Sequence, residues 1–101
     1  MKLKFEWDEN KNKKNFLKHK VSFEEARTVF DDENAFYDDD PDHSIEEMRF
    51  IVIGKSEEFE REITVCYCDR SVTDDEEIIR IISARRAEKH EIEIYLRGGL
   101  L

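Results

Sequence analysis

The sequence predicts an α+β fold in which a strand and two helices precede a curved antiparallel sheet, and a last helix closes the chain. Three observations lead to this fold class. The length of 101 residues corresponds to about one domain. Apolar residues recur at helical spacing early in the chain and alternate with polar ones in the middle. The alternating segments follow one another through short polar connections, which favour antiparallel neighbours. We therefore expect a single domain over residues 1–101 with the order β-α-α-β-β-β-β-α.

The N-terminal segment predicts a short strand followed by a lysine-rich helix. Apolar and polar residues alternate in "KLKFEW", which is typical of a strand. Asp8 is a suitable N-cap for a helix that runs to about His19. Phe16 and Leu17 are the main apolar residues of this helix, so we expect them to anchor it to the core.

A second helix is predicted directly afterwards. "SFEE" at 22–25 has the pattern of a capping box, in which the first and fourth side chains each bond the other residue's backbone N–H. "DDEN" at 31–34 ends this helix. The apolar residues at helical spacing between these limits are Phe23, Ala26, Val29 and Phe30.

The remaining chain predicts four strands and a helix. The strand-like segments are 35–40, 48–56, 62–68 and 77–83. Ser83 can cap a final helix that ends near Gly98. "HEIEIYL" alternates, so a strand is an alternative there, but Ala84 and Ala87 favour the helix.

Charge is distributed unevenly along the chain. The net charge of -9 argues against a protein that coats nucleic acid through a generally basic surface. Residues 1–20 nevertheless carry a balance of +4 and residues 79–101 a balance of +2, whereas residues 21–78 carry -15. If the two ends of the chain meet, the fold has one basic face on an acidic body.

Nothing in the sequence indicates export or a membrane span, so we expect a cytoplasmic protein. No apolar run reaches the length of about 18 residues that a spanning helix needs, and the N-terminus lacks the apolar core of a signal peptide. Cys66 and Cys68 are too few for a zinc site and, two apart on a strand, too strained for a disulfide, so we expect reduced thiols.

The chain contains three blocks in a characteristic order: "FEWDENKNKKNFLKHKVSFEEARTVFDD", "DDDPDHSIEEMRFIVIGKS" and "IIRIISARRAEKHEIEIY". Together they resemble the BrnT family, the toxins of type II toxin–antitoxin modules. The resemblance implies a RelE-like fold, a ribonuclease activity that blocks translation, and no cofactor. It also implies a cognate antitoxin, BrnA, which covers the toxin and binds operator DNA through a ribbon-helix-helix domain. The sequence departs from the family at Lys20, where Gly is common after "KH", so the turn there is expected to differ if it requires a left-handed residue.

Four arginines are the candidate catalytic residues: Arg49, Arg80, Arg85 and Arg86. RNA cleavage by an internal 2′-hydroxyl adds negative charge to a phosphate, and arginine donates two parallel hydrogen bonds to such oxygens without losing its proton. No metal ion is then required. For Arg49 and Arg80, which interrupt strands, an ion pair with an acid at the edge of the core is an equally good interpretation.

Strand parity sets a condition on this site. Arg80 and Arg85 point to opposite faces if the strand runs straight through both, so one shared site requires the chain to turn at Ser83.

The basic first helix is the candidate RNA-binding surface, through Lys11, Lys14, Lys18 and His19. The three lysines share a helical face. The alternatives are a solvated face for the lysines and a favourable interaction with the helix dipole for His19. The acidic segment 38–42 with His43 does not match a known metal-binding pattern, so we expect no metal there.

Two functions follow. The first is a metal-independent ribonuclease toxin that blocks translation and is neutralised by a BrnA-type antitoxin. The alternative is a catalytically weak binding module that acts with a DNA-binding antitoxin in transcriptional autoregulation, since a net charge of -9 repels free RNA.

Overall fold

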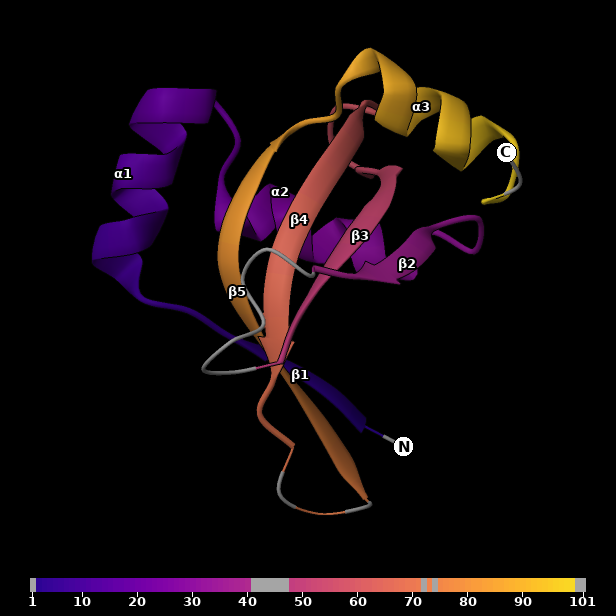
Figure 1. Ribbon diagram of the computed structural model, residues 1–101. Helices are drawn as coiled ribbons and strands as arrows, with labels where there is room; N and C mark the ends of the chain where they lie inside the picture. Colours follow the sequence, from indigo (N-terminus) through magenta and orange to yellow (C-terminus); the bar gives the residue numbers. More distant parts are fainter. Residues whose placement is uncertain (1, 41–47, 72, 74, 100–101) are drawn as a thin grey trace.

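The computed structural model describes residues 2–40, 48–71, 73 and 75–99. Three α-helices, one 3-10 helix (η1) and a sheet make up this part of the chain (Figure 1). In chain order the elements are β1 (Lys2–Glu6), α1 (Glu9–His19), α2 (Phe23–Thr28), η1 (Val29–Asp31), β2 (Phe36–Asp39), β3 (Arg49–Lys55), β4 (Glu62–Asp69), β5 (Glu76–Arg86) and α3 (Lys89–Leu96). The predicted α+β class is confirmed, and no helix among these residues is long and apolar enough to cross a bilayer.

The sheet has five strands in the order β1-β5-β4-β3-β2 and curves along its length (Figure 1). Strands β2 to β5 form an antiparallel meander, whereas β1 pairs with β5 in parallel. The prediction of a purely antiparallel sheet was therefore wrong. Parallel neighbours need a long crossover, and here that crossover contains every element between the first strand and the last. Alternation within "KLKFEW" predicts a strand but cannot show which strand it joins.

The core lies between the sheet and α2, which crosses behind the strands (Figure 1). Phe30 makes edge-to-face contacts with Phe5 and Tyr67, at ring-centroid distances of 5.1 Å in both cases. The fully buried members of this cluster are Val21, Phe23, Ala26, Val29, Val52, Ile63 and Val65. Helix α2 does not cover the opposite face of the sheet. Helix α3 lies across one end of the molecule and contacts β3.

Helix α1 is fastened to the sheet by asparagines, and the prediction that Phe16 and Leu17 anchor it was wrong. Their exposed fractions are 48% and 72%, while Asn12 and Asn15 are buried. Asn15 donates to the carbonyls of Val21 and Ala84, both at 2.8 Å, and accepts from the Ala84 N–H at 3.1 Å. The Asn15 amide thus bonds the backbone N–H and carbonyl of Ala84 as a neighbouring strand would, because β1 pairs with β5 only as far as Arg80.

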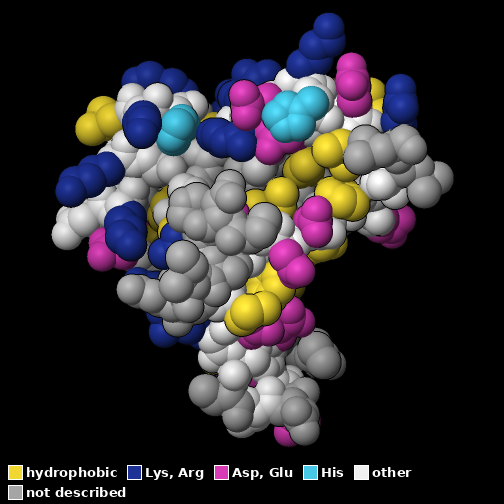
Figure 2. All heavy atoms as spheres, in the orientation of Figure 1, with side chains coloured by type: hydrophobic (Ala, Val, Ile, Leu, Met, Phe, Trp, Pro, Cys, Tyr) yellow, Lys and Arg dark blue, Asp and Glu magenta, His cyan; other side chains and the backbone are white. Residues whose placement is uncertain are grey.

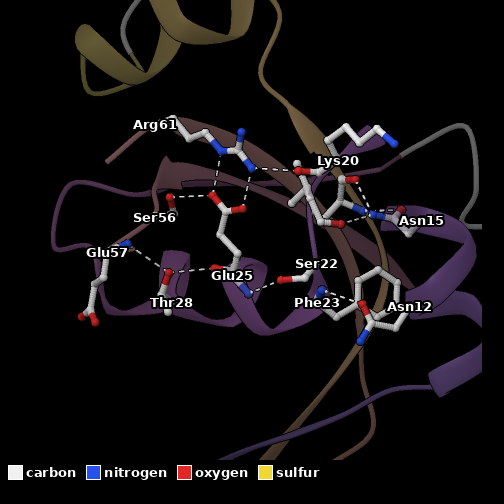
Figure 3. A network of polar contacts seen from close by, with 12 residues as sticks. Asn12, Asn15, Lys20, Ser22, Phe23, Glu25, Thr28, Ser56, Glu57 and Arg61 are labelled. Atoms are coloured by element: carbon white, nitrogen blue, oxygen red, sulfur yellow. Dashed lines mark hydrogen bonds and ion pairs between the residues drawn. The ribbon is translucent and has the colours of Figure 1, made fainter. Parts of the chain in front are cut away.

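The predicted capping box at the start of α2 is only half formed (Figure 3). Ser22 accepts from the Glu25 N–H at 3.0 Å, as predicted. The Glu25 carboxylate instead accepts bonds from Arg61 and Ser56. Because a buried carboxylate gains more from a guanidinium than from one backbone N–H, the ion pair takes precedence over the reciprocal cap.

Lys20 ends α1 in the left-handed conformation, with φ 59° and ψ 30°. Its N–H donates to the Phe16 carbonyl at 2.8 Å and its own carbonyl accepts from Arg61 at 2.9 Å. The expectation that the turn would differ without glycine was therefore wrong: lysine adopts the strained geometry instead.

Strand β5 runs through to Arg86, so the prediction that Ser83 caps a helix was wrong. Ser83 pairs with Cys66 and Arg86 with Ile63 on β4, and these ladder bonds outweigh the helical preference of the alanines. Helix α3 begins at Lys89, after a capping box between Glu88 and Glu91. The predicted helical conformation of "HEIEIYL" is confirmed.

Candidate functional site

A bulge in β5 decides how the arginines face. The pairing of β4 with β5 shifts register between Cys66 and Tyr67, so that Cys68 pairs with Arg80 but Thr64 pairs with Arg85. Thr64 and Cys68 have the same parity on β4 and therefore share a face. The extra residue in β5 thus brings Arg80 and Arg85 to one face. From the sequence, a shared site for Arg80 and Arg85 required a turn at Ser83. The strand instead continues through Ser83, and its extra residue changes which side chains face each side of the sheet.

The same pairing sorts the other two arginines. Arg49 on β3 pairs with Cys68, so it shares the face of Arg80 and Arg85. Arg86 pairs with Ile63, a buried core residue, and so belongs to the α2 face. Its charge there helps to lower the pKa of Glu25, though less than the closer groups around that carboxyl do. The sheet therefore gathers three of the four candidate arginines on one face and places Arg86 on the other.

A pocket with a volume of about 300 Å³ lies on this shared face. Arg49 and Arg85 both line it, from strands on either side of β4. The full lining is Asp40, Arg49, Ile51, Thr64, Cys66, Ile82, Ser83 and Arg85. It combines cationic donors, hydroxyl groups, a thiol and aliphatic walls, which suits a ligand with both an anionic and an apolar part.

Arg85 is held in place by Glu91 from the first turn of α3. Nη1 and Nη2 donate to the two carboxylate oxygens of Glu91 at 2.7 Å and 3.0 Å. Burial acts to raise the pKa of Glu91, but the bonds from Arg85 and from the Glu88 N–H outweigh it, and the pKa lies below its usual value. The carboxylate therefore stays ionised near neutral pH and fixes the direction of the guanidinium at the pocket wall.

Arg80 lies on the same face but does not line the pocket. Nη1 donates to Glu6 on β1 at 2.8 Å, and both side chains are partly exposed. This contact is the ion pair that the sequence left open as an alternative, and it ties the parallel strand to β5. Exposed pairs of this kind add little stability, so the contact does not prevent Arg80 from also serving a ligand.

Cys66 and Asp40 also line the pocket, whereas the sequence predicted only a reduced thiol for Cys66 and an acidic segment without a metal for Asp40. The Cys66 thiol is 3.6 Å from an Asp40 carboxylate oxygen. Burial, with the nearby negative charge of Asp40, raises the pKa of Cys66 to about 11. The thiol is thus neutral at physiological pH and does not act as a nucleophile. Alternation along β4 could have placed Cys66 beside Thr64, but no pattern in the sequence points to Asp40.

The lysines predicted to bind RNA lie outside the pocket. Lys11, Lys14 and Lys18 are exposed on α1, and His19 is half-buried at its C-terminal end. Lys and Arg side chains gather over α1 and over the end of the sheet next to α3 (Figure 2). Basic side chains from both ends of the chain are therefore visible in one view (Figure 2), with acidic side chains among those near α3.

One group among the described residues could hold a metal ion, namely Glu88, His90 and Glu91, whose ligand atoms lie within 4.8 Å of one another. Glu91 already accepts two bonds from Arg85, and the positive guanidinium disfavours a cation at the same carboxylate. His43, the other residue considered as a ligand, lies outside the described residues.

A small α+β domain with an arginine-lined pocket beside a lysine-rich helix defines a protein suited to a phosphate-bearing ligand. The sequence profile of one family, "Ribonuclease toxin, BrnT, of type II toxin-antitoxin system", matches residues 7–91. The chain belongs to this BrnT family, and the resemblance noted in the sequence is confirmed. No curated protein matches it. Membership indicates a ribonuclease toxin with an antitoxin partner and an RNA substrate.

Proposed function

We propose that this protein is an endoribonuclease toxin that cleaves mRNA without a metal ion at the pocket between Arg49 and Arg85. The observation that carries this proposal is the bulge in β5, because it brings Arg85 to the face on which Arg49 lies. Two guanidinium groups at one pocket provide donors for several non-bridging oxygens of a phosphate. The whole chain, residues 1–101, is taken as one toxin domain with a RelE-like fold, located in the cytoplasm.

The chemistry would be an internal transfer. The 2′-oxygen attacks phosphorus, the bond to the 5′-oxygen breaks, and the leaving 5′-oxygen takes up a proton from water, so that a 2′,3′-cyclic phosphate and a 5′-hydroxyl result. The arginines stabilise the added charge on the phosphate oxygens. Asp40 is the one carboxylate among the described residues that line the pocket, so it is the candidate acceptor of the 2′-hydroxyl proton.

The remaining candidate residues take supporting roles. Arg80 lies next to the pocket on the same face and would contact a neighbouring phosphate. Arg86 lies on the core face, which argues against a direct contact. Lys11, Lys14, Lys18 and His19 would guide the RNA strand along α1. A BrnA-type antitoxin with a ribbon-helix-helix domain would neutralise the toxin, and cleavage, on or off the ribosome, would block translation.

The alternative is a catalytically weak module that acts only with its DNA-binding antitoxin. It is favoured by the net charge of -9, which weakens attraction for free RNA.

Cleavage of a labelled single-stranded RNA in excess EDTA separates the two functions. We expect wild type to cleave, and Arg49→Ala and Arg85→Ala to lower kcat by about 100-fold or more. Arg97→Ala, an exposed arginine at the end of α3, is the matched control and should cleave like wild type. No cleavage by wild type would favour the binding module, and equal cleavage by all variants would exclude this pocket.

A further inference from the structure

The outer surface of α1 carries an apolar groove that the fold does not use. It has a volume of about 400 Å³ and lies between α1 and the start of α2. Its lining is Asn12, Lys13, Phe16, Leu17, Ser22 and Glu24. Phe16 and Leu17 supply large side chains that are 48% and 72% exposed. Both lie in the last turn of α1 and line one groove, so they form a contiguous apolar surface rather than scattered residues.

These side chains are not needed to attach the helix. The amides of Asn12 and Asn15 fasten α1, through bonds to the Phe23 N–H and to both backbone groups of Ala84. The helix is therefore held by its inner face while its largest apolar residues remain in water. Exposing them costs solubility without a gain in folding, so a bound partner is the physical reason to keep them.

The charge around the groove specifies the partner. Two exposed lysines share the face of α1 that carries Phe16 and Leu17, at the spacing i, i+3, i+4 and i+7: Lys13, which lines the groove, and Lys20, directly after the helix. The Lys20 ammonium lies 5.9 Å from the centre of the Phe16 ring. This basic rim stands on a chain whose net charge is -9, so it is opposite in sign to the molecule as a whole. A complementary ligand must bring apolar side chains flanked by carboxylates.

RNA meets only part of this description. Phosphates complement the lysines and a base can stack on Phe16, but Leu17 offers no aromatic face and is the more exposed of the two. An amphipathic helix with acidic flanks satisfies both the lysines and the apolar floor, through side chains spaced at i, i+3 or i+4.

We propose that this surface, the α1 groove, docks an acidic amphipathic helix of the antitoxin. The proposal rests on membership of a toxin–antitoxin family and not on the cleavage mechanism. The groove shares no lining residue with the arginine pocket, so a helix bound here would leave that pocket open.

The test measures the affinity of the purified toxin for the purified antitoxin of the same module, by calorimetry at low and at high salt. Leu17→Asp places a carboxylate in the apolar floor and should weaken binding by about 30-fold or more. Leu96→Asp on α3 is the matched control, because Leu96 is also 72% exposed and does not line the groove. Lys13→Glu should weaken binding more at low salt than at high salt.

Each outcome decides the proposal. Weaker binding by Leu17→Asp with wild-type binding by Leu96→Asp supports it, whether or not the toxin cleaves RNA. Equal affinity of wild type and Leu17→Asp would overturn it. It is also overturned if Leu17→Asp alters only affinity for a single-stranded RNA, or only self-association in gel filtration, since the occupant is then RNA or a second copy. Leu17→Ala and circular dichroism guard against a folding defect.

Discussion

The protein contains two bidentate arginine–carboxylate pairs, in two regions that differ in access to solvent. Arg61 binds the two oxygens of Glu25 at 2.8 Å and 2.7 Å, and Arg85 binds those of Glu91 at 2.7 Å and 3.0 Å. Both carboxylates are buried, with exposed fractions of 1% and 6%. Each arginine also donates to a backbone carbonyl, Arg61 to that of Lys20 at 2.9 Å (Figure 3) and Arg85 to that of Arg86 at 3.3 Å, but only Arg85 lines the pocket. The first pair joins elements of the fold, and the second holds a charged group at an opening.

The comparison teaches that bidentate geometry alone does not reveal a functional arginine. What separates the two is the surface that each guanidinium meets, because only Arg85 lines the pocket. The four predictions below test that distinction, from the largest expected effect to the smallest.

Removing the carboxylate of the closed pair should have the largest effect on stability. Glu25→Ala leaves the Arg61 guanidinium and the Ser56 hydroxyl without their partner in a buried setting. We expect the free energy of unfolding to fall by about 3 kcal/mol or more, measured by urea denaturation. Glu33→Ala, at an exposed carboxylate, should stay within about 0.5 kcal/mol of wild type. A loss below about 1 kcal/mol for Glu25→Ala would show that the pair is dispensable.

Removing the carboxylate of the open pair should affect catalysis more than stability. Glu91→Gln keeps the shape but releases Arg85 from a charged partner, and water can reach that guanidinium. We expect a loss of about 1–2 kcal/mol in stability and a fall in kcat for RNA that exceeds the change in KM. Glu93→Gln, on the exposed side of α3, is the control. If kcat is unchanged, Glu91 has no positioning role and the two pairs are alike.

Both pairs should make the free energy of unfolding depend on pH in the acid range. Burial opposes ionisation of Glu25, yet Arg61 and Ser56 lower its pKa below the ordinary value of 4.5, as Arg85 and the Glu88 N–H do for Glu91. Because the folded pKa values are depressed, their contribution is complete above 4.5 and is lost as the pH falls through the folded values. Urea denaturation at pH about 3 to 6 should show this loss in wild type. An equally steep loss in Glu25→Gln would contradict a role for Glu25.

The smallest expected effect concerns the turn that supports the closed pair. Lys20 has φ 59°, and its carbonyl accepts from Arg61. Lys20→Gly should raise the free energy of unfolding by up to about 1 kcal/mol, since glycine adopts this conformation without steric strain. Lys20→Ala is the control and should bring no gain. Thermal unfolding checks both, and a loss of stability in Lys20→Gly would show that the lysine side chain matters more than the backbone strain.

Local patterns predicted a good part of this structure. Strand-like runs between polar connections predicted β3 and β4, and composition predicted helix α3 despite its alternating segment. These features depend on neighbours in sequence, which a single chain displays. The same patterns wrongly predicted that Phe16 and Leu17 anchor α1. The helix is held instead by asparagine amides that bond the edge of the sheet, and such bonds leave no periodic pattern in the sequence. The parallel partner of β1 is likewise set by tertiary packing.

The site was predictable in its residue types but not in its geometry. Four arginines suggested a phosphate site, two on predicted strands and two near the start of the predicted last helix, and Arg49 and Arg85 line one pocket. Whether they met depended on the pairing of β4 with β5, which a period of two cannot reveal when an extra residue is present. Glu91 and Asp40 were not predicted as site residues for a related reason. Glu91 matters because the fold places it against Arg85, and Asp40 because the fold places it at the pocket.

The bulge in β5 makes the site depend on the register of this strand. If β5 paired regularly beyond Ile81 without the bulge, every residue from Ser83 to Arg86 would pair one position further along β4 and exchange its side of the sheet. Arg85 would then face the core opposite Ile63, and Arg86 would face outward. A slip of one residue in this pairing therefore reassigns the site between two adjacent arginines, and the "RR" pair keeps an arginine on the outer face in either register.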